Sequence, residues 1–189
     1  MIKFARIILL IICLFINSTA FCKELNSDQR IDSAIQIIKE HGYTKNIAIL
    51  QGDNYTHKPV TIIFHDLSEV NFSYAKFYAI SSNDNNGDLY ILINQDLQNS
   101  DPKALACLIL HESVHCQKNV ADSAEQETLA HQKETMLYLQ LLDEDESLQY
   151  KTNDRLILRL NKFKKLYDEA IMSYLSNNES YVNYLHLKK

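Results

Sequence analysis

The pattern of apolar residues changes near the middle of the chain, and this change constrains the fold more than any other feature. Upstream of residue 100, short apolar runs of the β-strand type occupy 46–50, 60–64, 75–80 and 89–94. Downstream of residue 101, the apolar positions recur at helical spacing. Short strands followed by a series of helices are typical of the α+β class. We therefore expect an α+β fold in which a small, mainly antiparallel sheet precedes two or more helices.

Capping and turn signals predict where the first elements begin and end. Residues 27–41 carry isoleucines at helical spacing and are followed by Gly42, a residue type that commonly ends helices. The segment 81–88 is rich in serine, asparagine and aspartate and separates two of the apolar runs. We expect 77–80 and 89–93 to form the two arms of a hairpin around it.

Three helices are predicted after the sheet. Asp101 is a suitable N-cap and Pro102 suits the first helical position, so a helix should start there and end near residue 118. Ser123 and Gln126 form a capping box for a second helix, which should end at the acidic run DEDE. The spacing of later apolar residues predicts a third helix over about 154–175.

The sequence HESVH at residues 111–115 is the strongest functional signal. His111 and His115 are four residues apart, so on a helix both imidazoles project from one face, one turn apart. This spacing allows both rings to bind one tetrahedral zinc ion. Glu112 points to the side of the pair, where it can act as the general base on a metal-activated water. The alternative is an ordinary helix with two surface or core histidines.

His111, Glu112 and His115, together with the hairpin and helix that lead to them, resemble the zincin metallopeptidases. The resemblance implies a zincin-like fold, a bound zinc ion and the hydrolysis of peptide bonds in a peptide or protein substrate. It also implies an edge strand above the cleft that binds the extended substrate backbone. The run at 89–94 is the candidate for that edge strand.

The resemblance also indicates where the third protein ligand should be found. The metzincin branch of the zincins has glycine and histidine where this chain has Lys118 and Ala121, so that branch is excluded. The gluzincin branch takes its third ligand from a glutamate on the following helix. Glu127 and Ala130 match the E-x-x-A element of several gluzincin families.

The expected antiparallel arrangement of the two helices ranks the acidic candidates. If the connection is centred near residue 120, the two histidines lie level with about residues 125 and 129, and Glu127 falls between these levels. Glu134 would lie about 7–8 Å beyond the farther histidine. We therefore predict Glu127 as the third ligand. Glu125 is the second choice, and His131 is an alternative ligand, an orienting residue or a helper for the transition-state oxyanion.

The N-terminus has the pattern of a secretory signal peptide. A positively charged start precedes an uninterrupted apolar run at 7–16, and small residues fit a cleavage site after Ala20. We expect 1–20 to be removed and 21–189 to form a single domain that is exported to the periplasm or secreted. An uncleaved anchor, or a lipid attached to Cys22, is the alternative.

Charge and composition narrow the partners. The net charge is −5 and no basic cluster is present, which argues against nucleic acid because phosphate binding needs clustered lysine and arginine. An apolar content of 46% is ordinary for a soluble globular protein, so no membrane contact is expected for the mature form. We predict a zinc metallopeptidase with Zn²⁺ on His111, His115 and Glu127 and with Glu112 as the catalytic residue. The alternative is a zinc-binding or interaction module without catalysis.

Overall fold

The structure is a computed structural model that describes residues 28–117 and 124–176, with side chains as far as residue 170. The predicted signal peptide at 1–20, Cys22 and the capping residue Ser123 lie outside the described residues. The elements, in chain order, are α2 (Gln29–Glu40), α3 (Thr44–Leu50), β1 (Thr61–His65), α4 (Leu67–Val70), the 3₁₀ helix η1 (Phe72–Lys76), β2 (Ala79–Asn83), β3 (Leu89–Asn94), η2 (Gln95–Leu97), α5 (Pro102–His115), α6 (Ala124–Glu144), η3 (Glu146–Tyr150) and α7 (Arg155–Ser176). The expected α+β class is confirmed.

The sheet has three strands in the order β1-β3-β2. The predicted hairpin is confirmed, because β2 pairs with β3 in antiparallel fashion around the 84–88 turn. Its first arm is Ala79–Asn83 and not 77–80, since the start of the apolar run at 75–80 belongs to η1. Asp84 accepts hydrogen bonds there from the amides of Asn86 and Asp88, and Gly87 adopts a positive φ of 74°. Two expectations are wrong. The sheet is mixed, since β1 pairs with β3 in parallel, and 89–94 is the central strand and not an edge.

The apolar run at 46–50 forms most of helix α3, and the expected strand is wrong. A short apolar run cannot be assigned to a strand or a buried helix from periodicity alone. Contacts with distant helices determine that this segment is helical. The side chain of Asn46 donates to Ser113 Oγ at 2.7 Å and accepts from Lys133 Nζ at 2.9 Å, which ties α3 to α5 and α6.

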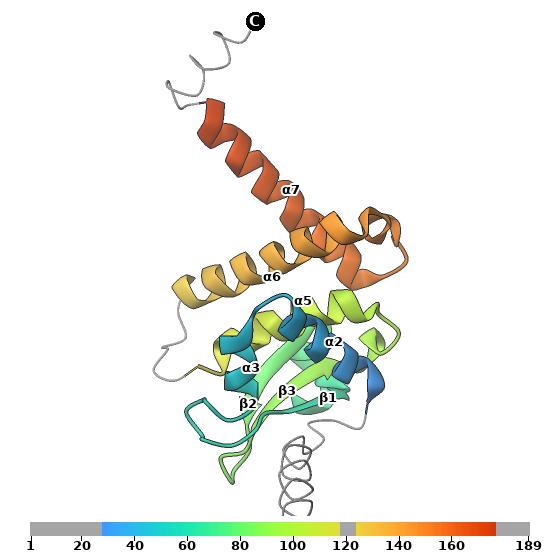
Figure 1. Cartoon of the computed structure of the whole chain (residues 1–189). Coiled ribbons are helices and arrows are strands. Elements are labelled where there is room, and N and C mark those ends of the chain that lie inside the picture. The colour runs from blue at the N-terminus through green and yellow to red at the C-terminus, as the bar shows by residue number, and fades with distance from the viewer. Residues whose placement is uncertain (1–27, 118–123, 177–189) are drawn as a thin grey trace, which may run out of the picture.

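Helix α5 lies at the centre of the molecule (Figure 1). The sheet and α2 cover one part of its surface and α6 covers another, so every residue from Ala104 to Val114 is buried. A helix enclosed in this way must be apolar on nearly all sides. His111 and Glu112 are the ionisable exceptions, and the fold therefore places them inside the protein next to a largely apolar core.

The helices that follow the sheet agree with the predicted ones. Asp101 caps α5 and Pro102 is its first residue. The start of α7 is tied to this cap, because Asp154 accepts from the amide of Asp101 at 2.7 Å and from Ser100 Oγ at 3.1 Å. The first turns of α7 pack on α5 and α6, whereas its second half projects away from the rest of the molecule (Figure 1). Within the described residues, no helix combines the length and apolarity needed to span a membrane.

Candidate metal centre

Helices α5 and α6 bring together the three predicted metal ligands. The Nε2 atoms of His111 and His115 lie 3.3 Å apart at the C-terminal end of α5. The Glu127 carboxylate reaches them from the first turn of α6, with Oε2 at 3.7 Å from His111 Nε2 and Oε1 at 3.4 Å from His115 Nε2. Ala130 is fully buried where the two helices pack, as its small side chain suggests. Glu127 therefore lies opposite both histidines, as the predicted antiparallel packing of the two helices requires.

The spacing of these donor atoms suits a small tetrahedral ion. Zinc bonds of about 2.0–2.1 Å at tetrahedral angles place ligand atoms about 3.3–3.4 Å apart. The two Nε2 atoms, 3.3 Å apart, and the contact of Glu127 Oε1 with His115 Nε2, at 3.4 Å, lie within this range. The contact with His111 Nε2 is made by the other oxygen, Oε2, and is longer at 3.7 Å. Two imidazoles and one carboxylate also form a common ligand set of catalytic zinc sites. The donors and their spacing thus fit zinc.

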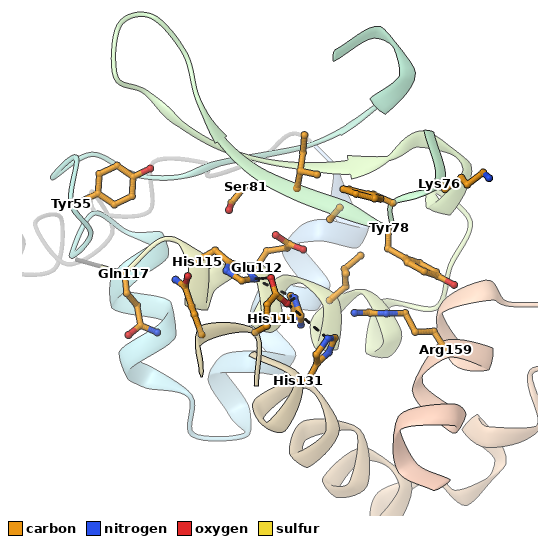
Figure 2. A pocket seen from close by; sticks show the side chains of 16 residues that line it. Tyr55, Lys76, Tyr78, Ser81, His111, Glu112, His115, Gln117, His131 and Arg159 are labelled. Atoms are coloured by element: carbon orange, nitrogen blue, oxygen red, sulfur yellow. Dashed lines mark hydrogen bonds and ion pairs between the residues drawn. The ribbon is translucent and has the colours of Figure 1, made fainter. Parts of the chain in front are cut away.

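Glu112 lies beside this group in a desolvated position. It is 6% exposed, and burial raises the pKa of its carboxyl from the ordinary 4.5 to about 8. The Arg159 guanidinium lowers this pKa, whereas the carboxylates of Glu134 and Glu127 raise it further. The Glu112 side chain lines the same cleft as His111 and His115 (Figure 2). A carboxyl in this position can exchange a proton near neutral pH.

Glu134 is a central residue of the site. The comparison of helix levels placed it about 7–8 Å beyond His111, too far for contact. Its carboxylate is completely buried, and Oε2 lies 3.1 Å from His111 Nδ1. The level argument failed because it ignored the tilt of side chains toward the N-terminus of their helix. In antiparallel helices this tilt moves Glu134 and His111 toward each other. Glu134 stands seven residues after Glu127, which is two turns along the same face, and that spacing was the available signal.

Arg159 on α7 completes the environment of Glu134. Both of its terminal nitrogens contact the Glu134 carboxylate, with NH2 at 3.0 Å from Oε2. The guanidinium lies 4.9 Å from the ring centre of Tyr78 and 5.0 Å from that of Phe163. Nothing in the local sequence around Arg159 indicates this role, because it depends on how α7 packs against α6.

His131 lies between Glu127 and Glu134 on α6. Its Nδ1 lies 3.2 Å from Glu134 Oε2, and its Nε2 lies 3.9 Å from Glu127 Oε2. The His131 ring is 4.7 Å from the His111 ring and 4.6 Å from the Phe163 ring. His131 thus adjoins the predicted ligands, and both the orienting role and the alternative ligand role remain compatible with its position.

Two other residues near the site, the second-choice ligand Glu125 and the buried Cys107, are not among the donor atoms. Among the described residues two groups of His and Glu could hold a metal ion, one of His111, His115 and Glu127 and the other of His111, His131 and Glu134. Glu125 is exposed and belongs to neither group. Cys107 lies four residues before His111 and is buried in the core. Burial raises the pKa of its thiol well above the ordinary value. Neither residue takes part in the cluster.

A cleft of about 960 Å³ opens over the site. Strand β2 and the residues before it form one wall, and α5, α6 and Arg159 form the other. Figure 2 shows Tyr55 and Gln117 at one end, Tyr78 and Arg159 at the other, and Ser81 above Glu112. The edge strand at the cleft is β2, which corrects the expectation that 89–94 has this position.

Comparisons with protein-family models, with curated proteins and with solved structures found no match. The arrangement of the site therefore carries the functional argument.

Proposed function

We propose that the protein is a zinc-dependent metallopeptidase of the zincin type, exported by its N-terminal signal peptide. The observation that carries the proposal is the convergence of His111, His115 and Glu127 at zinc-like spacing beside the buried carboxyl of Glu112. Neither an exposed acidic patch nor a chance pair of histidines on a helix would explain why the carboxyl of Glu112 is buried beside the histidines. The cleft above the group gives a substrate access to it.

Each residue of the cluster has a defined task in this proposal. His111, His115 and Glu127 would hold the ion, and zinc would supply Lewis-acid activation of a water and of the scissile carbonyl. Glu112 takes a proton from the attacking water and delivers it to the nitrogen of the leaving amine. Its desolvated position favours this exchange, because the protonated and ionised forms of its carboxyl are close in free energy near neutral pH.

The edge strand β2 suggests how a peptide is held. In the described sheet β2 pairs with β3 on one side only, so its other side faces the cleft with backbone groups that can bind an extended chain. A peptide added along this edge would pass above His111 and Glu112. The proposed substrate is accordingly an extended peptide segment, not a folded surface.

Zinc content and peptidase activity test the proposal in two stages. Protein purified without chelators should contain one zinc ion per chain, and His111→Ala and Glu127→Ala should lose it. Glu125→Ala is the matched control, since it removes an exposed acid from the same turn of α6. Wild-type protein that is folded but takes up no zinc, even when zinc is supplied, would refute the metal site.

Glu112→Gln separates catalysis from metal binding. It should retain zinc and lose peptidase activity by at least about 10²–10⁴-fold, the usual contribution of a general base. Activity is measured on a library of unstructured peptides with the chelated protein as the blank. A wild type that binds zinc but cuts no peptide, or a Glu112→Gln variant as active as wild type, would contradict the peptidase proposal. The first of these results would favour a non-catalytic zinc-binding module.

A further inference from the structure

The carboxylate of Glu134 has four hydrogen-bonding or charged partners inside the protein. It is fully buried and contacts His111 Nδ1 at 3.1 Å, His131 Nδ1 at 3.2 Å and both terminal nitrogens of Arg159. Three of these contacts are made to Oε2, and the fourth, from Arg159, is made to Oε1. Both carboxylate oxygens face the Arg159 guanidinium, which can only donate hydrogen bonds, and this two-point contact requires the carboxylate form. Glu134 is therefore an ionised acceptor.

An ionised acceptor dictates the protonation of the two imidazoles. Because Glu134 has no proton to give, both His111 and His131 must carry a hydrogen on Nδ1. In the neutral tautomer the lone pair of His111 is then on Nε2, the atom that lies among the predicted metal donors. Carboxylates that accept from the distal nitrogen of a ligating histidine fix its ring and increase its basicity. Glu134 has this relation to His111.

Arg159 determines where Glu134 can lie. Its two-point contact with the carboxylate is directional, and the rings of Tyr78 and Phe163 flank the guanidinium at 4.9 and 5.0 Å. Arg159 belongs to α7, whereas Glu134 belongs to α6 and His111 to α5. The chain of contacts thus runs from the first turns of α7 through one buried carboxylate to a predicted ligand.

We propose that Arg159 and Glu134 are positioning residues that couple the docking of α7 to metal binding by His111. The inference rests on the metal site proposed above and extends it to a helix that contributes no ligand. Coupling of this kind is reciprocal. Docking of α7 strengthens zinc binding, and zinc binding strengthens the docking of α7 by the same factor.

Zinc affinity in matched arginine variants tests the coupling. Arg159→Met should weaken zinc binding by about 10–100-fold, the usual effect of losing the partner of a metal ligand. Arg155→Met is the control, because Arg155 lies one turn earlier on α7 and also stacks near Tyr78, but it pairs with Asp96 on the surface. Its zinc affinity should stay within about twofold of wild type. Affinity is measured on the full protein by competition with a chelator.

A second variant keeps the test decisive if Arg159→Met fails to fold, since that substitution leaves a buried carboxylate without its cation. The double variant Glu134→Gln, Arg159→Met removes both charges and should fold, yet it should still lose about tenfold or more in zinc affinity. Imidazole nitrogen NMR of the metal-free protein adds a readout that a purely structural role would not change. The wild type should show His111 protonated on Nδ1, and the double variant should show a mixture of tautomers.

Hydrogen exchange tests the reciprocal effect. Zinc should slow amide exchange across residues 155–163 of the wild type and leave it unchanged in the double variant. A folded double variant with wild-type zinc affinity would overturn the inference, and so would equal losses in the Arg155 and Arg159 variants. If Arg159→Met weakens zinc binding but the wild type cuts no peptide, only the peptidase proposal is refuted. If the wild type cuts peptides but Arg159→Met binds zinc as tightly as the wild type, only the coupling is refuted.

Discussion

The raised pKa of Glu112 predicts a specific dependence of stability on pH in the metal-free protein. The carboxyl ionises near pH 4.5 in the unfolded chain and near pH 8 in the folded protein, because burial disfavours its charged form. Between these values the folded state binds one more proton than the unfolded state. The free energy of unfolding therefore falls as the pH rises through this window, and the contribution is fully present only below about pH 4.5.

The size of the effect follows from the shift. Each pKa unit corresponds to about 1.4 kcal/mol, so the full window is worth up to about 5 kcal/mol, and the part between pH 5 and pH 8 is about 3 kcal/mol. This is a large share of the 5–15 kcal/mol that is typical of whole domains. Glu112→Gln cannot ionise and has a similar shape. Its free energy of unfolding should exceed that of the wild type by an amount that grows by about 3 kcal/mol across this range.

Urea denaturation of both proteins in chelator, at several pH values between 5 and 8, measures the difference. Groups that titrate in both proteins cancel when the two curves are subtracted. Glu125→Gln serves as the control, since Glu125 is exposed and its difference from wild type should stay flat within about 0.5 kcal/mol. Parallel curves for wild type and Glu112→Gln would show that Glu112 is solvated in solution, and the reasoning from burial would be refuted.

Two further predictions concern the framework around the site, and both are measured by denaturation with urea. Asn46→Ala should lower the free energy of unfolding by about 1–3 kcal/mol, because it removes buried hydrogen bonds to α5 and α6. A double-mutant cycle of Asn46→Ala with Ser113→Ala should give a coupling free energy of about 0.5–1.5 kcal/mol. A coupling of zero would contradict the link between α3 and α5. Ile91→Ala on the buried face of β3 should cost about 2–5 kcal/mol, whereas Ile63→Ala, which is 39% exposed on β1, should cost less than about 1 kcal/mol. Equal losses would contradict the assignment of the two sheet faces.

Local chemistry explains the parts of the fold that sequence alone predicts. The glycine signal at Gly42, the cap at Asp101 and the turn at 84–88 act within a few residues, so the helices and the hairpin follow from the sequence. The strand order does not follow, because the parallel pairing of β1 with β3 joins segments that are far apart in the chain. The helix at 44–50 was missed for the same reason, since its conformation depends on contacts of Asn46 with distant helices.

The residues of the candidate site also divide into those that local spacing predicts and those that depend on tertiary packing. His111, Glu112 and His115 are neighbours on one helix, and their spacing alone indicates a shared function. Glu127 needed one tertiary assumption, the antiparallel packing of α5 and α6. Arg159 required the position of α7, which no residue near it specifies, and this is why the sequence did not reveal it.

The central position of β3 determines the order in which the sheet can assemble. Strands β2 and β3 are joined by a short turn and can pair as soon as both have been synthesised. Strand β1 emerges earlier, and its only partner in the described sheet lies beyond α4, η1 and β2. Until the hairpin docks, the backbone N–H and C=O groups of β1 have no partner strand and can pair with another chain. Slow hairpin docking would therefore expose this protein to aggregation before α5 and the later helices have covered the sheet.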